Sequence, residues 1–117
     1  MGTFTNAYHL SCWTLDQAIE KGNAAFKGRQ WNKAVSYYSG AIKINGTNAT
    51  YYCNRAAAYL ELGCFQQAEE DCSKAISLDK KNVKAYLRRG TAKETLLRYK
   101  EASQGEGALM GSLVWPL

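Results

Sequence analysis

Proline and long hydrophobic runs are the two features that this sequence almost entirely lacks. Among its 117 residues there is one proline, Pro116, so no helix is interrupted by proline before the last two residues. The most apolar stretch, 108–117, is ten residues long and is broken by Gly111, whereas a helix that crosses a bilayer needs about 20 residues. The first residues show no basic segment followed by an apolar one, the pattern of a signal peptide. We therefore expect uninterrupted helices, no membrane span and no secretion.

The sequence also has few of the side chains from which metal sites and catalytic centres are built. Its one histidine is His9, and its four cysteines, Cys12, Cys53, Cys64 and Cys72, show no C-x-x-C spacing, so we expect no metal site. No glycine-rich phosphate loop and no paired nucleophile and base are present. These absences predict that the chain is not an enzyme, has no catalytic residue and needs no cofactor. Cysteines without a secretion signal are typical of reduced thiols in a cytoplasmic protein.

What the sequence does contain is a repeat. Residues 49–82 read as two antiparallel helices, the first of which ends at Gly63, where a residue that tolerates positive φ is needed. Small residues let crossing helices approach closely, and aromatic residues wedge the next helix in place. Both kinds recur at an interval of 34 residues, at Gly22, Ala56 and Gly90, at Trp31, Phe65 and Tyr99, and at Ala34, Ala68 and Ala102. This interval predicts a stack of helix pairs.

The repeat divides the chain into three parts. We expect a lead-in over 1–14, a repeat domain over 15–102 and an atypical tail over 103–117, in which two glycines fall where a second helix should continue. Within the domain, the predicted repeats are 15–48, 49–82 and an incomplete one over 83–102. An incomplete last repeat leaves an apolar face open, so we also expect self-association into a homo-oligomer through this end.

The repeat length and the helix-turn-helix unit resemble those of the tetratricopeptide-repeat (TPR) family. The resemblance implies an all-α fold, an α-solenoid with about two and a half to three repeats and a truncated last one. In such a solenoid the first helix of each repeat lines a concave surface, where ligands bind. The implied function is protein–protein interaction.

Amide and cationic side chains gather on the predicted concave surface. Asn23 belongs to the first helix of the first repeat and Asn54 to that of the second, while Lys84 and Arg88 lie one turn apart in the third. Arginine forks onto carboxylate oxygens, lysine adds a compact charge, and amides donate hydrogen bonds. Together these groups suit a ligand with a pair of carboxylates.

These four residues resemble the carboxylate clamp of one TPR subclass, whose members bind the acidic C-terminal Glu-Glu-Val-Asp tail of cytosolic heat-shock chaperones. The resemblance implies a co-chaperone-like adaptor whose partners are the C-terminal peptides of the ninety- and seventy-kilodalton classes. The fifth clamp residue of the family is a lysine, and Ile19 stands in its place here. Lys27 is a further candidate for that role.

The run from Ala68 to Arg89 resembles the C-terminal domain of plant import receptors related to amidases, found in the outer membranes of chloroplasts or mitochondria. This implies a link to preprotein targeting. It also implies a location in the cytoplasm, or on the cytosolic face of such a membrane if the chain is part of a larger receptor.

The charge distribution leaves a second interpretation open. The net charge of +5 is concentrated in residues 79–101, which hold eight Lys and Arg against three Asp and Glu. In this interpretation the chain is a helical-repeat scaffold that binds another acidic partner, or nucleic acid, through the third repeat. Nucleic acid is not expected, because the charge is modest and is not interleaved with exposed aromatic residues. A free C-terminal carboxylate on the ligand would matter to a clamp but hardly to a general basic patch.

Overall fold

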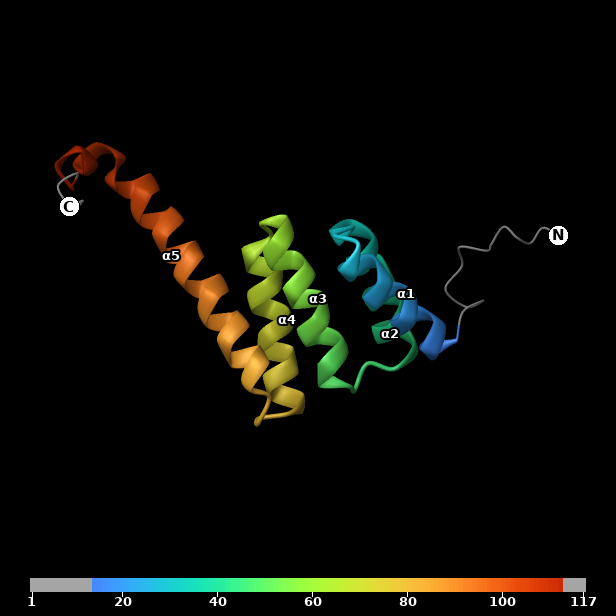
Figure 1. The fold of residues 1–117 in the computed structure, drawn as a ribbon. Helices are drawn as coiled ribbons and strands as arrows, with labels where there is room; N and C mark the ends of the chain where they lie inside the picture. Colours follow the sequence, from blue (N-terminus) through green and yellow to red (C-terminus); the bar gives the residue numbers. More distant parts are fainter. Residues whose placement is uncertain (1–13, 113–117) are drawn as a thin grey trace.

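A computed structural model describes the backbone of residues 14–112 and the side chains of residues 14–104. Within this range all the regular structure is helical (Figure 1). The helices are α1 (Leu15–Lys27), α2 (Trp31–Ile44), α3 (Ala49–Leu62), α4 (Phe65–Leu78) and α5 (Val83–Ser112). The predicted all-α solenoid is confirmed. Residues 1–13 of the predicted lead-in, with His9 and Cys12, and residues 113–117 of the predicted tail lie outside the described residues.

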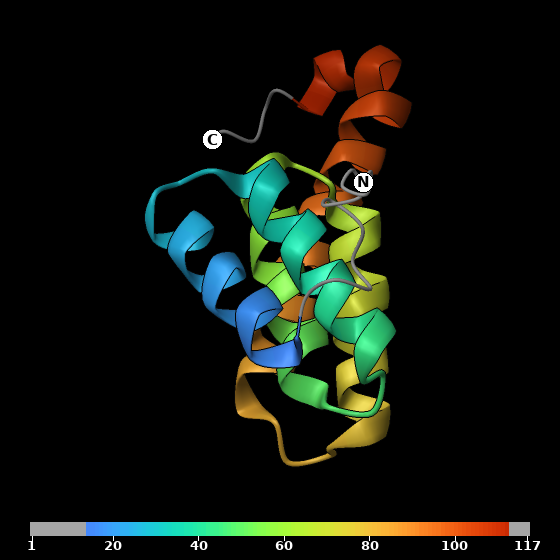
Figure 2. The ribbon, with the colours of Figure 1, turned by 90° about the vertical axis from the view of Figure 1, so that its right-hand side faces the viewer.

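Small residues hold the helix pairs together, as the repeat predicts. Ala34 and Ala41 of α2 are fully buried, and so are their equivalents one repeat later, Ala68 and Ala75 of α4. Alanine lets two helix backbones come close, so that each pair packs tightly without large side chains at the crossing. Viewed along the stack, α1 and α2 lie in front of α3 and α4 (Figure 2).

The turns inside the first two pairs depend on a left-handed residue at the same place in each repeat. Gly63 has φ 81° and ends α3, and its equivalent Arg29, 34 residues earlier, has φ 60°. Glycine adopts this conformation without cost, whereas another residue pays roughly 1 kcal/mol or more. The third position of this series is Leu97, a residue poorly suited to the left-handed region.

The third repeat therefore does not turn. The sequence predicts a first helix followed by a fragment of a second, but α5 continues as one helix of 30 residues through the glycines at 105 and 107. Leu97, at the turn position, lies inside this helix. The C-terminal part of α5 extends beyond the other helices (Figure 2). Within residues 14–112, no helix is both long and apolar enough to cross a membrane.

The outer face of α5 carries apolar side chains that nothing covers within the described part of the chain. Val83 and Leu87 are each 67% exposed, and Leu97 is 58% exposed. A Cβ added to Gly90 would meet no atom within 4 Å, although its equivalent Ala56 is fully buried. These positions are apolar or small because the repeat pattern places a second helix against them, and α5 does not supply one.

A buried ion pair fixes α3 between its neighbours. Arg55 of α3 donates from Nε and Nη2 to the two carboxylate oxygens of Asp71 in α4, each at 2.7 Å, and from Nη1 to Oγ of Ser39 in α2 at 2.9 Å. Hydrogen bonding to Asp71 is the main cause that raises the pKa of Arg55. Three helices are thus joined through one side chain, next to the predicted site residue Asn54.

Candidate functional site

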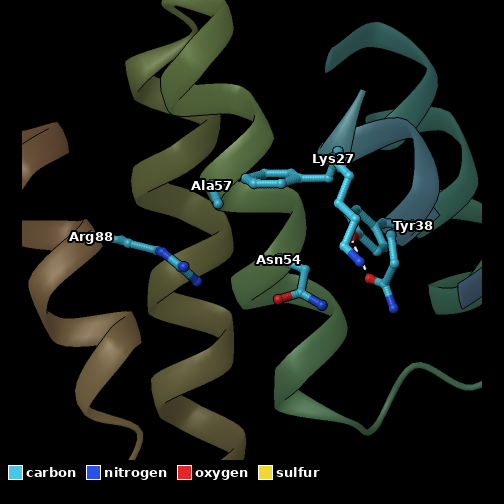
Figure 3. Close-up of a pocket in the computed structure, with 7 residues that line it drawn as sticks. Lys27, Tyr38, Asn54, Ala57 and Arg88 are labelled. Atoms are coloured by element: carbon cyan, nitrogen blue, oxygen red, sulfur yellow. Dashed lines mark hydrogen bonds between the residues drawn. The ribbon is translucent and has the colours of Figure 1, made fainter. Parts of the chain in front are cut away.

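A cavity of about 340 Å³ opens between α1, α3 and α5, on the surface that the first helices line. We call it the groove (Figure 3). Its lining residues are Asn23, Phe26 and Lys27 of α1, Tyr38 of α2, Asn54 and Ala57 of α3, and Arg88 of α5. Figure 3 shows Arg88 reaching in from one side, opposite Lys27 and Tyr38, with Asn54 between them. The groove is therefore built by all three first helices and by one second helix.

Three of the four predicted clamp residues line this groove. Asn23, Asn54 and Arg88 come from three helices that are distant in sequence, and the fold brings them to one cavity. Lys27, the accessory candidate, lines it as well. The structure thus gathers two amides and two cations around the same space.

The other two predicted residues lie elsewhere. Lys84 is exposed in the first turn of α5 and is not among the residues that line the groove. It stands one helical turn before Arg88 on the same helix. Ile19 is half-buried and packs against the core formed by Ala18, Ala41 and Tyr51. Its side chain therefore contributes to the packing of α1 and adds no charge to the groove.

Tyr38 fixes one end of the groove. Its hydroxyl donates a hydrogen bond of 2.6 Å to Oδ1 of Asn23, and the residue is only 2% exposed. The tyrosine ring can lie this close to α1 because residue 22 is glycine, since a Cβ there would come within 2.6 Å of the ring atom Cε1. Burial raises the pKa of Tyr38, and the charge of Arg88 acts in the opposite direction.

Cys53 fixes the other end. Nη1 of Arg88 donates to the Cys53 backbone carbonyl at 3.2 Å and lies 3.0 Å from its Sγ. Sγ of Cys53 is in turn 3.9 Å from Oδ1 of Asn82, whose side chain also accepts from the Ala85 amide at the start of α5. These contacts set both the beginning of α5 and the position of Arg88 against α3.

Most of the polar groups that remain available in the groove are hydrogen-bond donors, and the side-chain oxygen of Asn54 is an acceptor beside them. No described residue accepts a hydrogen bond from the amide nitrogen of Asn23, from Asn54, or from Nε and Nη2 of Arg88. Lys27 adds a second positive charge, and no acidic side chain lines the cavity among the described residues. Phe26 and Ala57 provide an apolar surface beside these groups. This arrangement suits a small anionic ligand that carries an apolar side chain.

Sequence reasoning missed two residues of the groove, Phe26 and Tyr38. The contact between Tyr38 and Asn23 spans 15 positions and two helices, so the spacing of residues along one helix does not reveal it. The sequence did contain one indication of this contact: residue 38 is a tyrosine, although a phenylalanine would fill the same space. A buried hydroxyl requires a partner, and that partner is a groove residue.

Comparison with known proteins identifies the repeat. The family model described as "Tetratricopeptide repeat" matches residues 49–82, and one described as "TPR repeat" matches residues 22–63. A curated relative, "Translocon at the outer membrane of chloroplasts 64" of Pisum sativum, is 69% identical over 83 residues. The aligned part is 71% of this chain but only 14% of that protein, so the chain spans about a seventh of the relative's length.

Two solved structures are similar over most of their length. The Arabidopsis OM64 TPR domain has a TM-score of 0.70 and 69% identity, and the match covers 82% of this chain and 80% of that one. The second TPR of Spaghetti (RPAP3), bound to the HSP90 peptide SRMEEVD, has a TM-score of 0.70 and 36% identity, with 82% and 89% coverage. The peptide in that second structure ends in Glu-Glu-Val-Asp.

Proposed function

The chain belongs to the tetratricopeptide-repeat family, and we propose that its groove binds the acidic C-terminal Glu-Glu-Val-Asp tail of cytosolic heat-shock chaperones. One observation carries the proposal: Asn23, Lys27, Asn54 and Arg88 converge on a single cavity and offer it donors and positive charge without an acid. The family is one of interaction modules, and a similar structure holds a peptide with this ending. The partners would be chaperones of the ninety- and seventy-kilodalton classes.

Each groove residue has a role that follows from its geometry. Cys53 holds one nitrogen of Arg88, so Nε and Nη2 can fork onto a carboxylate of the terminal aspartate. The amides of Asn23 and Asn54 donate to carboxylate oxygens, and Lys27 supplies a compact charge. Phe26 and Ala57 offer the valine an apolar contact.

Lys84 has a different role from Arg88 in this proposal. Because it is exposed and stands one turn before Arg88 without lining the groove, it would attract the glutamates that precede the valine rather than hold the terminal residue. Exposed charge pairs contribute little affinity and mostly steer association. Lys84→Ala should therefore weaken binding less than Arg88→Ala, and its effect should shrink as salt is added.

The role of the whole protein is a further part of the proposal. The relatives named as outer-envelope and translocon proteins suggest a receptor at the cytosolic face of a chloroplast or mitochondrial outer membrane. A groove that captures chaperone tails there would dock chaperones that deliver preproteins.

Calorimetric titration with a Glu-Glu-Val-Asp peptide tests the proposal. Hydrogen bonds to charged groups contribute roughly 1.5–3 kcal/mol, so Arg88→Ala should weaken binding by at least about tenfold. Arg98→Ala is the matched control, because Arg98 lies on the same helix and pairs with Glu94 at 3.0 Å outside the groove. Equal affinities of the two variants would refute the assignment.

The same titration separates the clamp from a general basic patch. A peptide with an amidated C-terminus keeps its acidic side chains but loses the terminal carboxylate. The proposed groove should bind it at least tenfold more weakly, since one charge-assisted contact is lost. Undiminished binding of the amidated peptide would instead favour an acidic partner on the basic face of α5. On that helix, however, Lys93 and Arg98 already have acidic partners within the chain.

A further inference from the structure

The contact between Tyr38 and Asn23 determines which end of the Asn23 amide a ligand can use. An asparagine side chain carries an acceptor oxygen and a donor nitrogen, and rotation by half a turn exchanges them. Here Oδ1 accepts the Tyr38 hydroxyl at 2.6 Å, so the nitrogen is the end that remains for a ligand. Asn23 therefore enters the groove as a donor.

Tyr38 is well suited to hold this orientation. It is 2% exposed and is pressed against Gly22, so its ring has little freedom to move away. If the Asn23 amide turned round, its nitrogen could donate to the hydroxyl oxygen, but the buried hydroxyl hydrogen would then lose the one acceptor that the described residues give it, so the observed orientation is favoured. Burial, the larger of the two influences on the pKa of Tyr38, favours the protonated form.

We propose that Tyr38 is a specificity-determining positioning residue, which locks Asn23 as a donor and makes the groove select a terminal carboxylate over a terminal amide. The inference rests on the proposed function, since it concerns the ligand of the same groove. A carboxylate only accepts hydrogen bonds, whereas an amide also donates and needs an acceptor near it. With Asn23 locked, its oxygen is available to neither ligand, so a terminal amide finds one acceptor fewer for its donors, and the side-chain oxygen of Asn54 is left to receive them.

The hydroxyl alone is responsible for the lock, which makes Tyr38→Phe an informative variant. Phenylalanine keeps the ring against Gly22 but releases Oδ1 of Asn23. The amide can then rotate and offer its oxygen to an amidated peptide, while the free-acid peptide loses a fixed donor. Both changes lower the ratio of the two affinities, and a net hydrogen bond makes the expected drop about three- to tenfold.

The experiment measures the affinities of free-acid and amidated Glu-Glu-Val-Asp peptides for the wild type, Tyr38→Phe and Tyr52→Phe. Tyr52 is the matched control, because its hydroxyl donates to the Gly46 carbonyl at 3.1 Å and it does not line the groove. We expect the acid-to-amide ratio to fall in Tyr38→Phe and to stay at the wild-type value in Tyr52→Phe. A loss of general packing would weaken both peptides alike and leave the ratio unchanged, which would overturn the inference.

Two further readouts keep the proposal falsifiable. In an Asn23→Ala background, Tyr38→Phe should no longer change the ratio, because the group that it positions is gone; a change that persists would overturn the role. In the unmutated protein, the side-chain amide resonances of Asn23 should shift when the free-acid peptide is added, and unshifted resonances would contradict the assignment. A wild type that binds both peptides equally would refute the proposed function itself, whereas a selective wild type with a selective Tyr38→Phe would refute only the role of Tyr38.

Discussion

Replacing Asp71 by asparagine is expected to destabilise the helix stack by about 3 kcal/mol, because it leaves Arg55 charged and poorly paired inside the protein. Only 8% of the Asp71 side chain and 20% of the Arg55 side chain are exposed. Breaking a buried pair by removing one partner typically costs roughly 3–5 kcal/mol. The lower end applies here, since Arg55 keeps its bond to Ser39 and lies 5.8 Å from the ring centre of Tyr59.

Thermal unfolding followed by circular dichroism measures this loss of stability. For a domain of this size, 1 kcal/mol corresponds to about 4–8 °C, so the melting temperature of Asp71→Asn should fall by roughly 12–24 °C. Glu94→Gln is the matched control, because it makes the same chemical change in an exposed ion pair. The side chain of Glu94 is 64% exposed and that of its partner Arg98 is 73% exposed. Such a pair contributes about 0.3–0.5 kcal/mol. If Asp71→Asn costs no more than Glu94→Gln, the pair does not hold α3 as described.

Three further predictions concern the clamp, the core and the open face of α5. Ile19→Lys, with its stem over the same core and its charge extended towards the groove, should tighten tail binding about tenfold by calorimetry; unchanged or weaker binding would mean that Lys27 already fills the role or that the register of α1 differs. Burial raises the pKa of Cys72 to about 12, above the ~8.5 of a free thiol. The contribution of this thiol to the free energy of unfolding should be complete below about pH 8.5 and should be lost as the pH rises towards 12. In Cys72→Ala, the free energy of unfolding should therefore fall less steeply over this pH range. The protein should self-associate in sedimentation experiments at rising concentration, and Leu87→Gln should weaken the association; a monomer at every concentration would contradict this.

The helix pairs could be predicted closely because their determinants are local and periodic. Gly63 ends the first helix of the central repeat, as predicted, and the second begins two residues later, at Phe65. Small residues at a fixed interval identify the crossing points without any knowledge of the fold. The same periodicity gave a wrong prediction at Tyr99. This residue continues the aromatic series, which predicts a turn before it, but it lies within α5. A repeat interval indicates where a turn would fall, but it does not show whether the turn forms.

The groove could be predicted only in part, because its contacts cross between helices. Spacing along a helix places Asn23, Asn54 and Arg88 on suitable faces, and the cavity includes all three. This spacing does not show how far along α5 the cavity extends. Lys84 was predicted to bind the ligand together with Arg88, and it is not among the described residues that line the cavity. Nor can the spacing show that Tyr38 reaches Asn23, since that bond depends on how α2 leans on α1 over Gly22.

Residues 105–117 should be dispensable for binding, although α5 extends into them. Among residues 14–104, whose side chains the structure describes, those that line the groove lie at or before Arg88, and α2 is the second helix that contributes, through Tyr38. In the third repeat, the position equivalent to Tyr38 is Glu106, sixteen residues after Gly90, and a Cβ at Gly90 would contact nothing. A chain that ends at Gln104 should bind the tail peptide within about twofold of the full chain, and a tenfold loss would show that the removed residues contact the ligand or hold Arg88 in place.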